Sequence, residues 1–205
     1  MRFPNAYKGV KKLFTAEILG IVSTVLLVIV AAIALAGGSG DIAEGESAAI
    51  GTVAGVIGII ALILGIIYVV INLVGLSQCS KDEKAFKTAF IFAIIQLIVT
   101  CFSGALDDKM SFIDLLVKLC TIIVFIYTIQ GISNLAKKYG NENMVSLGNK
   151  IIILQLILII VSAILDILPK GTTGNIATTV SSVLDVVIFV VYLVYLSRAK
   201  KMLEK

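Results

Sequence analysis

The stretch "GISNLAKKYGN" (Gly131–Asn141) ends a long apolar run, and closely similar endings occur twice more in the chain. "GLSQCSKDEKA" begins at Gly75, and "YLSRAKKMLEK" begins at Tyr195. In each stretch an aliphatic residue and a serine close the apolar run and lysines follow; the pairs are Leu76-Ser77, Ile132-Ser133 and Leu196-Ser197. The recurring boundary between apolar and basic residues indicates one structural unit that is used three times.

The composition indicates that the apolar runs lie in a lipid bilayer. Of the 205 residues, 59% are apolar and 15% are charged, whereas a soluble domain has about 25% charged residues. The mean hydropathy is +1.09. The net charge of +4 is compatible with nucleic acid as a partner, but in a membrane protein the location of the lysines matters more than their sum. We therefore expect the bilayer, and not nucleic acid, to be the partner of this chain.

Six segments are long enough to cross a membrane, because the bilayer core of about 30 Å takes about 20 helical residues. The first segment could instead be a secretory signal. Its uncharged run from Ile18 to Ala36 is longer than a usual signal core, and the repeat requires it as a span. The predicted segments are 14–36, 48–76, 86–106, 112–133, 147–168 and 173–197.

The basic residues predict the orientation of these segments. Fourteen of the seventeen lie at the N-terminus, after the second and fourth segments, or in the C-terminal tail. The opposite connections contain only Lys109 and Lys170, and the connection Gly37–Ser47 is acidic. Because lysine and arginine accumulate on the cytoplasmic side, we expect an integral protein of a bacterial cytoplasmic (plasma) membrane with both termini in the cytoplasm.

The three similar endings then fall at the cytoplasmic ends of the even-numbered segments. A second match supports the repeat: "QLIVTCFSGALD" (Gln96–Asp107) aligns without gaps with "QLILIIVSAILD" (Gln155–Asp166). The sequence therefore predicts an all-α integral membrane protein of six transmembrane helices arranged as three repeated helical hairpins. Residues 1–205 form a single transmembrane domain, and the hairpins cover approximately 12–80, 81–138 and 139–205.

A stripe of glycines marks the second segment. Spacings of four and three residues place its members on one helical face, and in lipid small residues allow helix backbones to approach closely. We expect this face to pack against the first segment, where Gly20 lies between Ala16 and Ser23. Ordinary helix packing without a functional role is the simpler interpretation. The stripe comprises Gly51, Gly55, Gly58 and Gly65, with Leu62 completing the series.

Asp185 is the charged residue least expected at its depth. It precedes Ser197 by twelve residues, which places it about 18 Å from the cytoplasmic end and near the midplane. An ionisable group there costs at least ~2.5–3.5 kcal/mol and needs a partner inside the protein. Lys118 lies within about 4–5 Å of the same height, while Thr121 and Ser182 could line a polar cavity. A structural ion pair and a protonated, hydrogen-bonded Asp185 are the alternatives.

Enzymatic chemistry finds little support in the sequence. The chain has no histidine, and its three cysteines form no C-x-x-C pair, which argues against a Ser-His triad and against the common zinc sites. "CFSG" (Cys101–Gly104) lacks the first glycine of a G-x-S-G motif. Asp166 and Asp185 differ in depth by some 10 Å, whereas a shared-proton dyad requires about 3 Å. We predict no catalytic activity, no cofactor and no metal site.

Two classes of function remain. In the first, the chain is a transporter, a channel or a membrane-embedded solute-binding subunit with a polar site near Asp185. In the second, it is a non-catalytic structural, stress, immunity or accessory protein that acts by lateral helix contacts, as a homo-oligomer or with another membrane protein. A solvated site at Asp185 favours the first class, and a dry pair with Lys118 favours the second.

Overall fold

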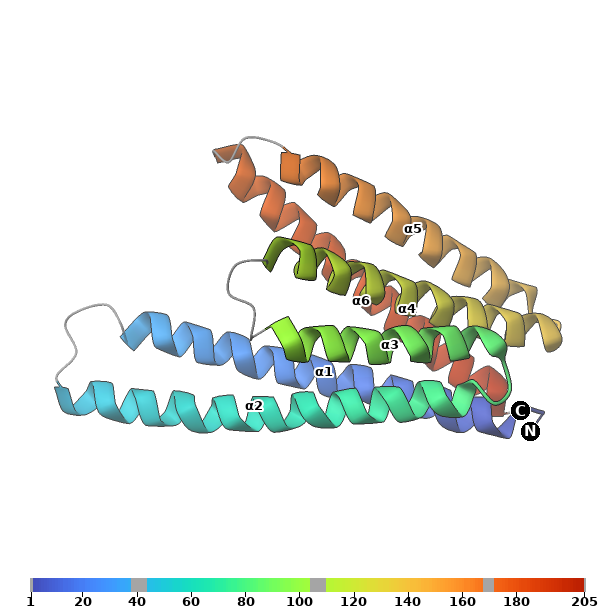
Figure 1. Ribbon diagram of the computed structural model, residues 1–205, viewed down its shortest axis with the longest axis horizontal. Helices are drawn as coiled ribbons and strands as arrows, with labels where there is room; N and C mark the ends of the chain where they lie inside the picture. Colours follow the sequence, from blue (N-terminus) through green and yellow to red (C-terminus); the bar gives the residue numbers. More distant parts are fainter. Residues whose placement is uncertain (1, 38–43, 104–109, 168–171, 205) are drawn as a thin grey trace. The chain divides into compact units, whose positions relative to one another are not determined.

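The computed structural model describes residues 2–37, 44–103, 110–167 and 172–204, and within them every long element is an α-helix. The side chains of 36–50, 103–111, 162–183 and 185 lie outside this description. No strand occurs among the described residues, so the predicted all-α class is confirmed. The helices are α1 Pro4–Gly37, α2 Glu44–Cys79, α3 Lys84–Ser103, α4 Met110–Lys138, α5 Glu142–Ile167 and α6 Thr172–Glu204 (Figure 1).

Five of these helices contain a stretch long and apolar enough to cross a membrane. The stretches are Pro4–Leu35, Gly51–Cys79, Lys84–Phe102, Phe112–Lys138 and Glu142–Val161. Much of the first half of α6 lies among the side chains outside the description, so the sixth span stays a prediction. The helices carry many exposed aliphatic side chains, among them Leu97 and Ile98 on α3. Lipid is the solvent suited to such surfaces.

Several helices extend beyond their predicted bounds. Helix α1 begins at Pro4 and not near residue 14, α4 ends at Lys138 and not near 133, and α6 ends at Glu204 and not near 197. Hydropathy marks where lipid contact stops, whereas a helix continues as long as its backbone hydrogen bonds and side-chain packing support it. The additional turns carry most of the basic residues.

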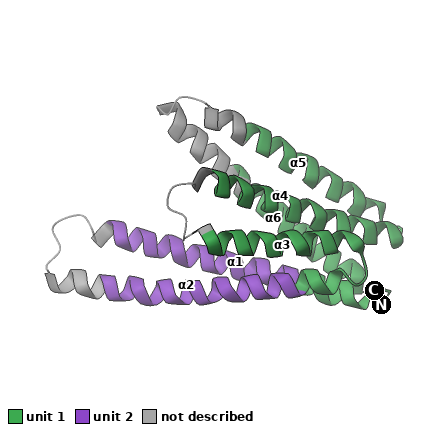
Figure 2. Ribbon diagram, viewed as in Figure 1, with its two compact units in different colours: residues 1–11, 75–205 green, residues 12–74 purple. Residues whose placement is uncertain are grey.

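The chain divides into two compact units (Figure 2). Unit 1 comprises Met1–Lys11 and Gly75–Lys205, and unit 2 comprises Lys12–Val74, which lies within the first predicted hairpin. In unit 1, α3 packs against α4, α5 packs against α6, and α4 also contacts α5 and α6. The helices predicted to pair as hairpins are thus neighbours in unit 1, and so are α4 and α5. The threefold repeat remains a prediction.

The three repeated endings belong to the core of unit 1. Leu76, Ile132 and Leu196 are 1%, 0% and 0% exposed, so each closely packed aliphatic residue of the motif contributes to one apolar interior. Burial of such a side chain contributes about 1.5–3 kcal/mol. Other buried apolar residues of unit 1 are Ala6, Val10, Phe86, Ala89, Ile129, Leu135, Ala136, Ile151, Tyr195, Ala199 and Leu203.

Aromatic side chains set the register between α4 and α6. The buried hydroxyls of Tyr195 and Ser133 lie 2.9 Å apart, and the Tyr195 hydroxyl also donates to the Ile129 carbonyl at 3.4 Å. Toward the N-terminal ends of both helices, the rings of Phe125 and Tyr192 pack at 4.9 Å between centroids. Because both contacts step along the two helices in the same direction, α4 and α6 run parallel.

Two residues turn the chain from α4 into α5. Gly140 adopts a φ of +71°, a left-handed conformation that glycine takes without strain. Its N–H donates to the Lys137 carbonyl at 3.0 Å, and the N–H of Asn141 donates to the Ala136 carbonyl at 2.9 Å, which is the Schellman pattern of a helix end. The Asn141 side chain then accepts from the N–H of Met144 at 3.2 Å and caps α5.

In unit 2, α1 contacts α2 through the predicted face around Gly20 and Ser23, whereas the contact face of α2 differs from the predicted one. The Ser23 hydroxyl donates to the Ala61 carbonyl at 2.9 Å. A Cβ at Gly20 would meet the Tyr68 ring at 3.3 Å, and a Cβ at Gly65 would lie 3.8 Å from the Ser23 hydroxyl. The contact face of α2 therefore follows Ala61, Gly65 and Tyr68.

The remaining glycines of the stripe do not face α1. A Cβ built at Gly51, Gly55 or Gly58 has no neighbour within 4 Å, and Leu62 is 63% exposed. The predicted packing against the first helix is therefore wrong for these positions. The stripe has a period of 3.5 residues, which drifts by about 20° per seven residues relative to a straight helix. Of the four glycines, only Gly65 has an α1 atom within 4 Å of its built Cβ.

Gly131 provides a test of the packing in unit 1. A Cβ at this position would lie 2.6–2.8 Å from ring atoms of Phe86, which is 0% exposed and has no room to withdraw. We expect Gly131→Ala to lower the stability by about 1–3 kcal/mol through overpacking. Gly55→Ala is the matched control, because its Cβ meets nothing. Thermal unfolding in detergent would measure both, and equal melting temperatures for the two variants would contradict the packing described.

Candidate functional site

The structure describes half of the predicted membrane site. The Thr121 hydroxyl accepts a hydrogen bond from Gln96 Nε2 at 2.9 Å and donates to the Val117 carbonyl at 2.9 Å. These bonds join α3 to α4 through polar groups within two predicted spans. Lys118, three residues before Thr121, is exposed in the isolated chain. The side chains of Asp185 and Ser182 lie outside the described residues.

Helix register places Asp185 and Lys118 at equivalent positions on α6 and α4. Asp185 precedes Tyr192 by seven residues, and Lys118 precedes Phe125 by seven, while Tyr192 and Phe125 are in contact. Seven residues make two helical turns, or about 10.5 Å, and return within about 20° of the starting direction. Because α4 and α6 are parallel, both positions lie two turns toward the N-terminal ends of their helices from this contact, and the difference in depth between them stays a prediction.

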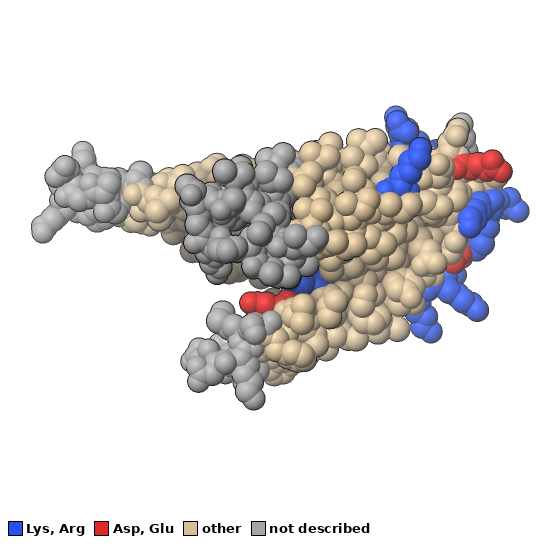
Figure 3. Space-filling view, turned by 90° about the horizontal axis from the view of Figure 1, so that it is seen from above, with Lys and Arg blue, Asp and Glu red and all other residues tan. Residues whose placement is uncertain are grey.

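A second polar cluster, at the end of unit 1 that carries the chain termini, was not predicted as a site. We call this region the basic end, because Lys81, Lys84, Lys137 and Lys138 line one pocket there and Arg2 bonds to the Lys138 carbonyl. Lysine and arginine side chains gather at one end of the surface in Figure 3. Its acidic members are Asp82 and Glu83, which follow each other directly in the connection between α2 and α3. The sequence signal was present, since an acidic residue directly before an apolar helical run is typical of a helix start.

Asp82 caps the first helix from a distant part of the chain. Its Oδ2 accepts from the backbone N–H of Ala6 at 2.7 Å, and its Oδ1 accepts from Asn5 Nδ2 at 3.1 Å. Pro4, the first residue of α1, has no N–H that needs a partner. The carboxylate therefore satisfies an otherwise unpaired helix N–H and faces the positive end of the helix dipole.

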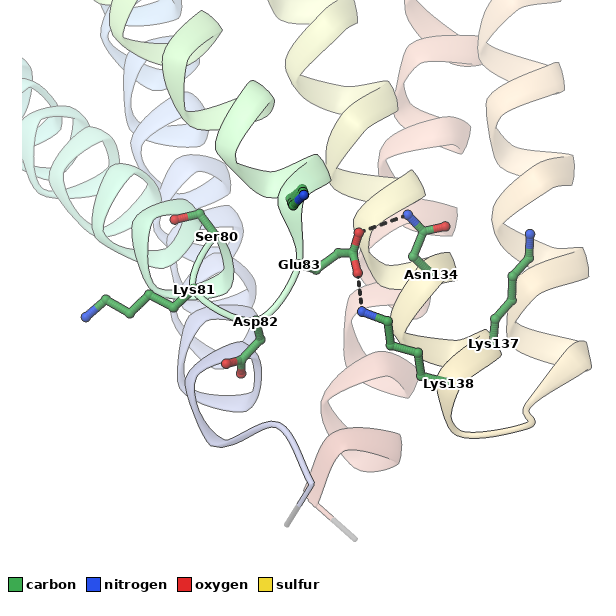
Figure 4. Close-up of a pocket in the computed structure, with 8 residues that line it drawn as sticks. Ser80, Lys81, Asp82, Glu83, Asn134, Lys137 and Lys138 are labelled. Carbon is green, nitrogen blue, oxygen red and sulfur yellow. Dashed lines mark hydrogen bonds and ion pairs between the residues drawn. The ribbon is translucent and has the colours of Figure 1, made fainter.

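Glu83 connects the start of α3 to the end of α4. Its Oε2 lies 2.6 Å from Lys138 Nζ, and its Oε1 accepts from Asn134 Nδ2 at 3.1 Å (Figure 4). Burial raises the pKa of Glu83, but the bonds from Lys138 and Asn134, with the backbone N–H of Ala85, outweigh it and hold the pKa below its usual value. Glu83 is 12% exposed and Lys138 is 46% exposed, so solvent screens the pair in part.

The N-terminal residues close over the same helix end. Arg2 Nη1 donates to the Lys138 carbonyl at 2.8 Å, which satisfies an acceptor at the C-terminus of α4 with a cation. The rings of Phe3 and Tyr139 meet edge to face with centroids 5.6 Å apart, and Lys138 Nζ lies 5.6 Å from the centroid of Phe3. The start of the chain and the α4 terminus are thus held together by a hydrogen bond, a ring contact and a cation–π contact.

A pocket of about 610 Å³ opens beside Glu83. Lys138 and Asn134 point toward Glu83, whereas Lys81 and Lys137 extend away from it on opposite sides (Figure 4). The carboxylates of Asp82 and Glu83 already have partners within the protein. Hydrogen bonds and an ion pair therefore occupy the centre of this pocket, and lysines lie at its rim. Its lining comprises Ser80, Lys81, Asp82, Glu83, Lys84, Asn134, Lys137 and Lys138.

The described residues hold no group of three or more His, Cys, Asp or Glu that could bind a metal ion. Comparisons with protein-family models, with curated proteins and with solved structures find no match to this chain. Its function is therefore argued from its own geometry.

The Glu83–Lys138 pair predicts a pH dependence of stability. The pKa of Glu83 in the fold lies below its unfolded value of about 4.3. Its contribution is therefore complete above that pH and is lost as the pH falls through the folded-state pKa. We expect Glu83→Gln to lower the stability at pH 7 by about 1 kcal/mol and to weaken the acid-induced loss. Melting temperatures between pH 3 and pH 7 would test this, with the exposed Glu204→Gln as control; parallel curves for wild type and Glu83→Gln would contradict it.

Proposed function

We propose that this protein is a membrane-embedded binding or permeation protein for a small cationic solute, with Asp185 as the recognising carboxylate. The observation that carries the proposal is the exposure of Lys118, the basic residue predicted to lie within about 4–5 Å of the depth of Asp185. A buried ion pair is stable only when both partners are enclosed and fully hydrogen-bonded. An exposed lysine does not fit the dry pair that is the structural alternative for Asp185.

Further polar groups near this level support the proposal. Thr121 is exposed and holds Gln96 of α3 by a hydrogen bond of 2.9 Å, so a hydroxyl and an amide already occur beside Lys118. Ser182 lies three residues before Asp185 on α6, a spacing that puts two residues on one helical face. Together these positions give a solute one charged group and several hydrogen-bonding groups inside a predicted membrane span.

Lateral assembly is the second candidate function. It is favoured by the open face of α2, where Gly51, Gly55 and Gly58 have no neighbour within the chain. Small residues on a lipid-facing surface permit close approach of another helix. In this case Asp185 would have a structural role, and no solute would bind beside it.

Thermal unfolding in a non-ionic detergent, with a panel of alkali cations and small primary amines, would distinguish the two candidates. Under the solute-binding proposal, at least one member of the panel raises the melting temperature of the wild type, because a ligand that binds only the folded state stabilises it. Asp185→Asn removes this ligand-dependent shift and leaves the ligand-free melting temperature nearly unchanged. Asp114→Asn, which changes an exposed carboxylate on α4, retains the shift.

A structural ion pair between Asp185 and Lys118 predicts a different result from the solute-binding proposal. Asp185→Asn would then leave Lys118 without its partner and lower the stability by ~3–5 kcal/mol. Replacing both residues, as Asp185→Asn with Lys118→Met, would restore much of that loss. No ligand-induced shift for any member of the panel, together with this pattern, would contradict the solute-binding proposal.

A further inference from the structure

The pocket at the turn between α4 and α5 has the polarity pattern of a phospholipid. It has a volume of about 530 Å³ and belongs to unit 1. Its polar lining residues are Lys137, Ser146, Asn149 and Lys150, and its apolar ones include Val145 and Ile153. Glu142 contributes one negative charge against the two lysines, so the lining carries a net positive charge.

One face of α5 continues from this pocket into the predicted span. Spacings of four, three, four and three residues place five exposed residues on this face. The first two are polar, and the other three are isoleucines that are 57%, 51% and 59% exposed. The change from polar to apolar follows the direction in which α5 enters its membrane-spanning stretch, Glu142–Val161. The residues of the face are Ser146, Lys150, Ile153, Ile157 and Ile160.

From this continuity we infer that the α4–α5 pocket binds the phosphate headgroup of an anionic phospholipid, with one acyl chain along the isoleucine face of α5. Lys137 and Lys150 provide the cations that a phosphate requires, and Ser146 and Asn149 provide hydrogen-bond donors. Basic pockets between transmembrane helices are suited to anionic headgroups. A free phosphate would use the lysines equally well but would leave the isoleucine face without a role.

The turn itself keeps the two lysines on one rigid frame. Gly140 and Asn141 end α4 and begin α5 with backbone and side-chain hydrogen bonds, so Lys137 and Lys150 are carried by helices joined through only three residues. Glu83, which lines the neighbouring pocket together with Lys137, is bound to Lys138 and Asn134. This inference does not depend on the solute site at Asp185.

The test uses the full-length protein in a non-ionic detergent and a short-chain fluorescent phosphatidylglycerol, with binding followed by fluorescence anisotropy. Replacing both lysines, as Lys137→Gln with Lys150→Gln, should weaken binding about 30-fold, given the typical contribution of a lysine near an anionic lipid surface. The matched control is Lys8→Gln with Lys201→Gln, which removes the same charge from exposed lysines of unit 1 outside the pocket. This control should bind within about threefold of wild type.

Two further ligands separate a lipid site from a simple phosphate site. Glycerol phosphate, which has the headgroup charge without acyl chains, should displace the fluorescent lipid only at far higher concentration than unlabelled phosphatidylglycerol. Phosphatidylcholine should displace it poorly because its headgroup has no net charge. Equal weakening in both double variants, or equal displacement by phosphatidylcholine, would overturn the proposed site, and equal displacement by glycerol phosphate would overturn the role of the acyl chain.

Discussion

The tightest packing in this chain is made by apolar side chains at the ends of the stretches that are predicted to contact lipid. Between helices surrounded by lipid there is no hydrophobic driving force, since the lipid tails are as apolar as leucine. The fully buried side chains of unit 1 accordingly include Leu76, Ile132 and Leu196, each at the point where an apolar run gives way to lysines. Water is near enough there for burial to contribute free energy, and the helices extend past their apolar stretches to make use of it.

Polar bonds then complete the same end of unit 1. Asp82 caps α1, and Glu83 joins the start of α3 to the end of α4. Each uses a carboxylate to satisfy groups that helix termini leave unpaired. Inside the predicted spans, polar contacts join neighbouring helices, such as Gln96 with Thr121 and Ser23 with Ala61. A packed, hydrogen-bonded end with exposed apolar helices beyond it is suited to a protein whose other contacts are lipid, a solute or another helix.

The two proposed sites depend on different features of the fold. The solute site depends on α4 and α6 running in the same direction, which the Phe125–Tyr192 and Ser133–Tyr195 contacts indicate. The phospholipid site depends on a short turn that places Lys137 beside the first turns of α5. Charge is rare in the first setting and abundant in the second. A single carboxylate is therefore enough to indicate the solute site. The phospholipid site is indicated by the continuity between its polar pocket and the apolar face of α5.

The sequence by itself determined the helical class, the bilayer as solvent and the positions where apolar runs end, because length, hydropathy and lysine placement are local properties. It did not determine which face of α2 meets α1: Gly51, Gly55 and Gly58 share a stripe with Gly65, yet only Gly65 lies on the contact face. Nor did it reveal that Asp82 caps a helix begun 78 residues earlier, at Pro4. Such pairings depend on small drifts of helix register and on contacts between distant segments, and only the tertiary structure fixes those.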